Sequence, residues 1–213
     1  MGDGGGPRRL LLVGMMGAGK SLAGQLVAAR LGWPWSDSDQ QIQRRTGQTV
    51  AQIFATRGEA AFRAEEARVL AEAVTGDEPA VVSVAGGAVL SADNRRLLRT
   101  AGVVVWLRAE LATLVARTAN GDHRPLLEGD RLSRLGLLYA ERRPHYEALA
   151  DAVIDVDDLA PGEVADRVVA AWHACTRRPE GSPAPRFGRP EAPLPASSAG
   201  PPVAGPRLGT HHA

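Results

Sequence analysis

The sequence contains a single lysine, although basic residues are common in it. Lysine and arginine together account for 25 of the 213 residues, so the other 24 basic side chains are arginines. A compositional bias toward arginine replaces lysine wherever the exchange is harmless. The exception, Lys20 in the segment GMMGAGKS (residues 14–21), therefore indicates a position where the exchange is harmful.

Other scarce features exclude several classes of protein. Cys175 is the only cysteine, which excludes an internal disulfide and a cysteine-cluster metal site and fits a reducing compartment. Aromatic residues make up 4%, too few for a base-stacking RNA platform, and a net charge of +1 gives no general attraction to nucleic acid or membranes. No apolar run approaches the roughly 18 residues of a membrane span, and the first residues lack the apolar stretch of a signal peptide. We expect a cytoplasmic protein with neither a nucleic-acid nor a membrane partner.

Composition divides the chain into three parts. Residues 1–8 read as a flexible N-terminus, and residues 9–176 hold the apolar content of one domain. Residues 177–213 contain nine of the 15 prolines and show no periodic apolar pattern, which predicts a disordered tail. A proline-rich docking segment is the alternative interpretation of that tail.

The central part alternates short apolar runs with helix-favouring segments. Pro161 predicts the start of the last helix, and Asp93 predicts the N-cap of an earlier one. Strands separated by helices indicate βαβ units, and hence an α/β fold with a mostly parallel sheet. Runs typical of buried strands occur at residues 9–13, 80–84, 103–107 and 152–156.

The glycine-rich segment around the lone lysine matches G-x-x-x-x-G-K-[ST]. It begins at Gly14, ends at Gly19-Lys20-Ser21, and lies between a predicted strand and a predicted helix. Glycines let backbone N–H groups surround phosphate oxygens, and the positive end of the helix favours their charge. Lys20 would reach the β- and γ-phosphates and Ser21 would bind Mg²⁺. The motif predicts nucleotide binding and leaves the phosphoryl acceptor open.

A pair of carboxylates follows in DSD. Asp37 and Asp39 would point to the same side if they lie at an extended strand end, one toward Mg²⁺ and one toward an acceptor hydroxyl. A polar turn with a helix cap is the alternative interpretation of this pair.

Four further motifs contain charged residues or glycines. Arg63 and Glu66 lie three residues apart on one predicted helix face, where a surface ion pair is the simpler interpretation. SVAGGAV ends a buried strand with two glycines, which indicates close approach by the backbone to another group. NGDHRPLL has the composition of a mobile lid, and ERRPHY places arginines beside a proline within a helix.

Together these motifs resemble those of the shikimate kinase family, from about Arg9 to Trp172. The family pattern is a Walker loop, D-[ST]-D, F-R-x-x-E, G-G-G, R-P-L-L and R-x-P-x-Y, and the corresponding text here is GMMGAGKS, DSD, FRAEE, AGG, RPLL and RRPHY. The resemblance implies a three-layer P-loop kinase fold, in which a five-stranded parallel sheet is flanked by helices and a mobile lid spans residues 119–131. It also implies ATP and shikimate as substrates, Mg²⁺ as the cofactor, and a monomer.

The resemblance implies specific roles on the acceptor side. Asp39 would hold the shikimate hydroxyls and act as, or orient, the base for the attacking oxygen. Arg63 and Arg142 would bind the carboxylate, with Glu66 orienting Arg63, because guanidinium groups suit a carboxylate better than an ammonium does. Gly86 and Gly87 would present backbone to the ring. Phe54 and Phe62 would line the pocket, although core packing explains both equally well.

On the nucleotide side the resemblance implies that Lys20 and Arg124 are catalytic, with Arg124 moving in on the lid to neutralise the transferred phosphoryl group. Ser21 and Asp37 would hold the metal. Arg117 and Pro161 would flank the adenine. The full set of expected nucleotide-binding residues is Gly14, Gly17, Ala18, Gly19, Lys20, Ser21, Leu22, Arg117, Arg124 and Pro161.

Two positions depart from the family pattern. Ala85 stands where the family has the first glycine of its triplet, and Leu22 stands where it commonly has threonine next to the α-phosphate. Neither change removes a charged catalytic group. Two alternatives stay open at this point: a related small-molecule kinase such as a gluconate kinase, and a non-catalytic nucleotide-binding relative.

Overall fold

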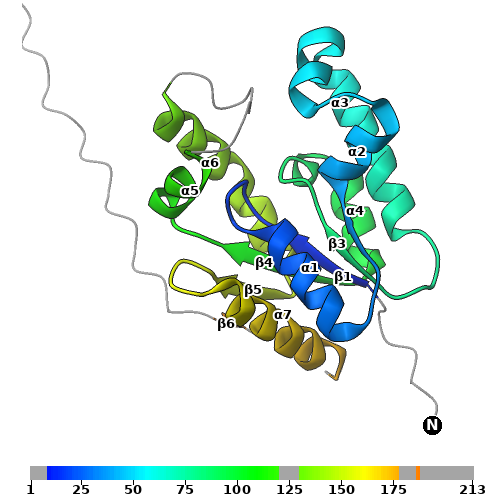
Figure 1. Cartoon of the computed structure of the whole chain (residues 1–213), viewed down its shortest axis with the longest axis vertical. Coiled ribbons are helices and arrows are strands. Elements are labelled where there is room, and N and C mark those ends of the chain that lie inside the picture. The colour runs from blue at the N-terminus through cyan, green and yellow to red at the C-terminus, as the bar shows by residue number, and fades with distance from the viewer. Residues whose placement is uncertain (1–8, 120–129, 178–185, 188–213) are drawn as a thin grey trace, which may run out of the picture.

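The computed structural model describes residues 9–119, 130–177 and 186–187, and a parallel sheet forms its centre (Figure 1). The strand order is β2-β3-β1-β4-β5-β6, and every described strand pair is parallel. The strands span Arg9–Val13 (β1), Trp35–Asp37 (β2), Ala80–Ser83 (β3), Val103–Arg108 (β4), Ala152–Asp155 (β5) and Arg186–Phe187 (β6).

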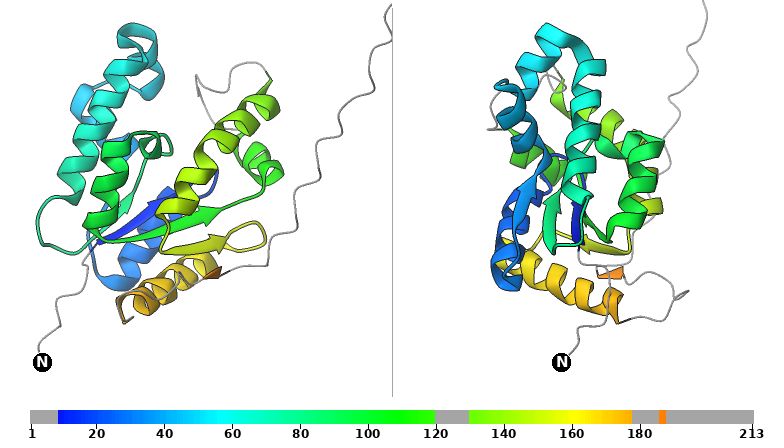
Figure 2. Two further views of the ribbon diagram at one scale, coloured as in Figure 1. Left: turned by 180° about the vertical axis from the view of Figure 1, so that it is seen from behind. Right: turned by 90° about the vertical axis from the view of Figure 1, so that its right-hand side faces the viewer.

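Helices cover both faces of the sheet. Helices α1 and α7 pack against each other on one face, whereas α4 and α6 contact β4 from the opposite face (Figure 2). Helix α2 packs on α3, and this pair stands across the carboxyl ends of the strands from α5 and α6. The helices span Lys20–Leu31 (α1), Ser38–Thr46 (α2), Val50–Val74 (α3), Ala92–Ala101 (α4), Leu111–Thr118 (α5), Arg131–Leu149 (α6) and Pro161–Thr176 (α7), with a 3₁₀ turn η1 at Ala88–Leu90.

The apolar strand runs are buried because helices cover both of their faces. Leu10, Leu11 and Leu12 are fully buried and belong to one large core that joins the sheet to its helices. Such two-sided burial produces a continuous apolar run instead of an alternating one. A second, smaller core lies between α2 and α3 and consists of Ile42, Ile53, Phe62 and Val69. Helices α2 and α3 therefore form a unit with packing of its own.

One local prediction needs correction. Helix α4 is capped by Ser91, whose side chain accepts the N–H of Asn94, and Asp93 lies within the first turn instead of at the cap. Helix α3 runs through a kink at Gly58, where a φ of 77° breaks the helical geometry. The predicted strands and the start of α7 at Pro161 are confirmed.

The sheet gains a sixth strand from the segment predicted to be a disordered tail. Arg186 and Phe187 pair with Val153 and Ile154 at the free edge of β5. The prediction of disorder is therefore wrong for these two residues, whose edge pairing supplies a local order that composition does not show. Residues 1–8, 178–185 and 188–213 lie outside the described residues. Among the helices of the described ranges, none has the length and apolar character that a membrane crossing requires.

We expect deletion of residues 178–213 to change turnover and the melting temperature little. Within the described residues this segment adds only a two-residue edge strand, which loses few hydrogen bonds when it is removed. A thermal melt beside the full chain checks this. A drop of more than about 5 °C, which corresponds to about 1–2 kcal/mol for a domain of this size, would show that the tail docks on the domain.

Candidate active site

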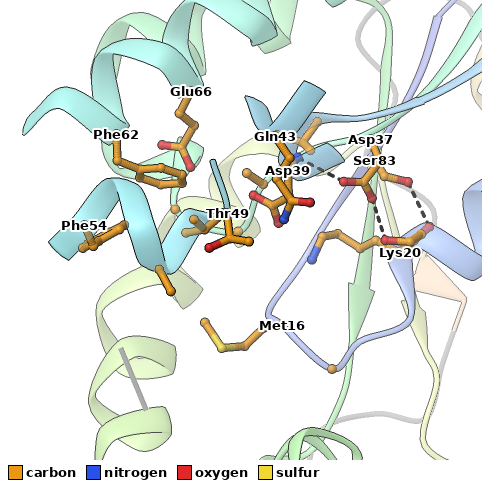
Figure 3. A pocket seen from close by; sticks show the side chains of 18 of the residues that line it. Met16, Lys20, Asp37, Asp39, Gln43, Thr49, Phe54, Phe62, Glu66 and Ser83 are labelled. Carbon is orange, nitrogen blue, oxygen red and sulfur yellow. Dashed lines mark hydrogen bonds between the residues drawn. The ribbon is translucent and has the colours of Figure 1, made fainter. Parts of the chain in front are cut away.

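A cavity of about 940 Å³ opens above the carboxyl ends of β1, β2 and β3. Strand β1 lies between β3 and β4, so the chain leaves it toward one side of the sheet and later returns on the other. Ligands of open α/β sheets bind at such a switch point, outside the carboxyl ends of the strands. Figure 3 shows side chains from the glycine loop, α2, α3 and β3 around one space.

The glycine loop between β1 and α1 forms one wall of the cavity. Gly14, Gly17 and Gly19 have φ angles of 145°, 85° and 89°, which side chains rarely adopt. A side-chain carbon at Gly14 would also lie 2.5 Å from the carbonyl oxygen of Leu107. Gly17 and Gly19 line the cavity, whereas Gly14 and the buried Ala18 shape the loop from outside it.

Lys20 is the first residue of α1, and its ammonium folds back over the loop. Its Nζ donates to the carbonyl oxygens of Gly14, at 2.8 Å, and Met15, at 3.0 Å. The side chain of Ser83 donates to the backbone carbonyl oxygen of Lys20 at 3.0 Å, and this bond fixes the start of α1 to the end of β3. The lone lysine therefore lies where a phosphate chain would enter the loop.

Ser21 and Asp37 join the glycine loop to the carboxylate pair. The Ser21 hydroxyl donates to Oδ2 of Asp37 at 2.6 Å. Oδ1 of Asp37 accepts the backbone N–H groups of Asp39 and Gln40 and so caps α2. A hydroxyl and a carboxylate are ligands that a Mg²⁺ ion accepts when phosphates and water complete its shell, so these two residues fit the predicted metal role.

The carboxylates do not share an extended strand, as the spacing alone suggested. Asp37 ends β2 with extended backbone, and α2 begins at Ser38, so Asp39 lies in the first helical turn. The cap formed by Asp37 causes this change of backbone, because it satisfies N–H groups that a helix start leaves free. Both aspartates still line the cavity, and the side chains of Asp39 and Lys20 point into the same part of it (Figure 3).

Arg63 is held by two carboxylates on α3. Its Nη1 donates to both oxygens of Glu66, at 2.9 and 3.1 Å, and its Nη2 donates to Glu59 at 3.0 Å. Glu66 is 2% exposed, and burial raises its pKa, with the charge of Asp39 adding to the effect. Burial lowers the pKa of Arg63, but Glu66 and Glu59 outweigh it, so the pKa is raised and the cation is retained. The predicted orientation of Arg63 by Glu66 matches this geometry.

The two predicted carboxylate-binding arginines converge on the two glycines of SVAGGAV. A side-chain carbon at Gly87 would lie 2.1 Å from Nη1 of Arg63, and one at Gly86 would lie 3.5 Å from Nη1 of Arg142. Arg142, on α6, is 2% exposed, and its Nε has no hydrogen-bond partner among the described residues. The sequence predicts glycines here for close approach. At Gly87 the approaching group is the Arg63 guanidinium, whereas at Gly86 the nearest group is the carbonyl oxygen of Gly14, at 3.1 Å.

Other predicted residues have mixed outcomes. Arg117 lines the cavity, and its Nη2 donates to the carbonyl oxygen of Val156 at 2.9 Å, which ties α5 to the segment before α7. Pro161 is the first residue of α7 and is not among the cavity-lining residues. Arg124 and residues 120–129 of the predicted lid lie outside the described residues, so their roles stay predictions.

Both interpretations of the two phenylalanines apply. Phe54 and Phe62 line the cavity, with their ring centroids 4.9 Å apart. Phe62 is also part of the small core between α2 and α3, and Phe54 packs against that core. Their packing therefore supports the wall of the cavity that faces the carboxylates.

The two departures from the family pattern lie on the cavity wall. Ala85 is buried where β3 gives way to the glycine pair, and Leu22 is 49% exposed. The sequence interpretation missed several other lining residues, because polar side chains at a strand end or helix start are common in any α/β domain. These are Met16, Gln43, Thr49, Gln52 and Ser83. A hydrophilic residue at the end of an otherwise apolar strand, as Ser83 is, was the one signal available.

Comparison with known proteins identifies related chains. The family model described as shikimate kinase matches residues 16–173. A shikimate kinase of Symbiobacterium thermophilum is 48% identical over 151 residues, which cover 70% of this chain and 86% of that protein. A shikimate kinase of Halorhodospira halophila is 45% identical over 166 residues, which cover 78% and 93%.

Solved structures agree with the sequence relatives. The shikimate kinase from Acinetobacter baumannii in complex with shikimate is 33% identical, covers 80% of this chain and 96% of that one, and superposes with a TM-score of 0.77. A gluconokinase from Sinorhizobium meliloti is 19% identical with a TM-score of 0.51, so it shares the fold alone. A family model that covers most of the domain, together with relatives of this identity and coverage, shows that the chain belongs to the shikimate kinase family.

Proposed function

We propose that this protein transfers the γ-phosphoryl group of ATP to the 3-hydroxyl of shikimate, giving shikimate 3-phosphate and ADP in aromatic amino-acid biosynthesis. The observation that carries the proposal is the pair of guanidinium groups that line the cavity beside Gly86 and Gly87. The family membership and the shikimate kinases among the relatives support the same reaction.

The arginine pair favours an acceptor that carries a carboxylate. Arg142 is almost fully buried, and its Nε has no partner among the described residues, which is a costly state for a cation. Arg63 and its two carboxylates bring a further charge to the same glycines. An acceptor carboxylate would supply the partner that the Nε of Arg142 lacks, and a planar guanidinium can bind a carboxylate through two parallel hydrogen bonds.

Asp39 is the residue that would act on the acceptor hydroxyl. It lies on the first turn of α2 and lines the same cavity as Lys20 and the two arginines. In the proposed reaction it accepts, or orients, the proton of the attacking hydroxyl while Lys20 stabilises charge on the phosphates. Because phosphoryl transfer depends mainly on positioning and charge, the spacing between these two side chains decides the rate.

Ser21 and Asp37 would hold the Mg²⁺ ion that accompanies ATP. Their direct hydrogen bond of 2.6 Å shows that both oxygens reach one point beside the glycine loop. The bound ion would neutralise charge on the β- and γ-phosphates. Asp37 contributes in a second way, because its other oxygen caps α2 and so fixes the position of Asp39.

An acceptor assay separates the candidate functions. ADP release is measured with shikimate, with gluconate and without an acceptor, each at saturating ATP and Mg²⁺. We expect release that depends on shikimate, with gluconate close to the background. Gluconate also carries a carboxylate, so release with gluconate alone would favour the related sugar-acid kinase, and no release above background would favour a non-catalytic nucleotide-binding protein.

A further inference from the structure

Tyr146 is a buried polar residue that the proposed reaction does not use directly. It lies on α6 one turn after Arg142, is fully buried, and is not among the residues that line the cavity. Its hydroxyl donates to the backbone carbonyl oxygen of Gly86 at 2.7 Å. Its ring stacks on Trp106 of β4, with centroids 5.7 Å apart. A side chain without access to the cavity can act on the site only through the wall residues that it contacts, which here are Gly86 and Arg142.

We propose that Tyr146 is a positioning residue, which sets the binding of the carboxylate-bearing acceptor by fixing the Gly86 peptide against Arg142. This inference rests on the proposed function, because it assumes that Arg142 binds the acceptor carboxylate.

The surroundings of Gly86 show how little freedom the peptide has. A side-chain carbon there would lie 3.1 Å from the carbonyl oxygen of Gly14, 3.4 Å from the Tyr146 hydroxyl and 3.5 Å from Nη1 of Arg142. Gly86 is therefore enclosed by the glycine loop, the tyrosine and the arginine. The next residue, Gly87, lies against Arg63 in turn. Rotation of the Gly86 peptide would change the distance between the two guanidinium groups and the backbone that the acceptor meets.

The hydroxyl is suited to a permanent donor role. Burial raises the pKa of Tyr146, and the charge and hydrogen bond of Arg142 reduce that rise without cancelling it. The phenol therefore stays protonated across the working pH range and keeps its bond to the Gly86 carbonyl. The Sδ atom of Met15, on the glycine loop, lies 3.9 Å from the hydroxyl oxygen of Tyr146, which is a much weaker contact. The acceptor side should therefore depend on the hydroxyl more than the nucleotide side does.

Tyr146→Phe tests the proposal, since it keeps the ring and its stacking and removes only the hydroxyl. The Gly86 carbonyl loses its buried donor, so we expect the KM for shikimate to rise about tenfold. The KM for ATP should stay within about twofold, because the nucleotide contacts are unchanged. Val168→Ala is the control for general destabilisation, since Val168 is a buried core residue on α7, on the far face of the sheet. It should lower the melting temperature and leave both KM values in place.

A second measurement covers the case in which Tyr146→Phe does not fold. The chain has two tyrosines, both on α6, so a Tyr139→Phe variant grown with 3-fluorotyrosine carries its only fluorinated ring at Tyr146. We expect its fluorine resonance to move when shikimate is added, and to move less with ATP alone. A fluorine resonance that does not move when shikimate is added would overturn the positioning role, as would equal rises in the KM values for shikimate and ATP. Absence of shikimate turnover in the unaltered chain would instead overturn the proposed function, and this inference with it.

Discussion

Lys20→Arg is expected to leave the protein folded and to lower turnover at least about a hundredfold, which corresponds to about 2.7 kcal/mol of activation free energy. Arginine is the residue that this chain uses at its 24 other Lys/Arg positions. The substitution is therefore typical of the sequence as a whole, and only the local geometry of the glycine loop disfavours it. If the lysine is there by chance of composition, the exchange should leave turnover unchanged. If the site requires a lysine, turnover should fall strongly.

The geometry around Lys20 explains the expected loss. The ammonium donates to two carbonyl oxygens of the glycine loop, at 2.8 and 3.0 Å, so its stem is short enough to fold inside the loop. A guanidinium group is wider, carries its charge farther from the stem and favours a forked arrangement of partners. The backbone of the loop is closely packed, as Gly14 shows by its approach to Leu107. A displaced cation no longer stabilises the charge that develops on the transferred group.

Turnover at saturating ATP and shikimate is measured beside a thermal melt. The fold should survive, because the bonds of the Lys20 ammonium to Gly14 and Met15 stay within its own loop and do not join it to the rest of the core. Arg68→Lys is the matched control, since Arg68 is 63% exposed and pairs with Glu72 on the same helix. This reverse exchange should leave turnover unchanged. Near-normal turnover in Lys20→Arg would mean that the single lysine is an accident of composition.

The central strands of the fold can be predicted from the sequence because their burial produces a recognisable pattern of apolar residues. Two-sided burial makes β1 and β4 continuous apolar runs, and Pro161 marks the start of α7. Strand β6 has no such apolar pattern, because Arg186 and Phe187 belong to a proline-rich segment and pair only with the edge strand β5. The N-cap of α4 was placed two residues late, since serine and aspartate both cap helices and only the backbone geometry distinguishes them.

The sequence predicts which residues form the site better than it predicts how they are arranged. Motifs identified the charged residues, but the position of Asp39 depends on a cap that turns the backbone into a helix directly after Asp37. The burial of Arg142 could not be foreseen either, because arginine is normally an exposed residue. Its proximity to Gly86, far away in the sequence, follows from the packing of α6 beside the sheet. No local pattern records such a contact.

Arg142→Ala and Arg63→Ala are each expected to weaken shikimate binding about ten- to a hundredfold and to leave ATP binding nearly unchanged. Each removes charge-assisted hydrogen bonds to the acceptor carboxylate, worth about 1.5–3 kcal/mol. Arg142 should show the larger effect. In the described structure its Nε has no partner, whereas Arg63 already has Glu59 and Glu66 as partners, and these would compete with the substrate.

The two variants differ in their cost to the fold. Arg63→Ala leaves Glu66, which is 2% exposed, without its main counter-charge, and the pKa of that carboxyl is already raised by burial. Adding Glu66→Gln to the variant removes the stranded charge, so any weakening of shikimate binding that remains reports on Arg63 itself. Arg142→Ala opens a cavity beneath Gly86, and Arg142→Lys, which keeps the charge but loses the fork, should fall between it and the unaltered chain.

Calorimetric titration with shikimate and with an ATP analogue, at temperatures well below each melting point, decides the assignment. Arg143→Ala is the matched control, because Arg143 is the next residue on α6, pairs with Glu147 and does not line the cavity. Its removal changes the net charge by the same amount, so a general electrostatic effect would appear in it as well. If the affinity for the ATP analogue falls as far as that for shikimate in the Arg63 and Arg142 variants, the two arginines do not bind the acceptor carboxylate. The geometry argues against that result, because both guanidinium groups line the cavity beside Gly86 and Gly87, and the buried Nε of Arg142 has no partner among the described residues.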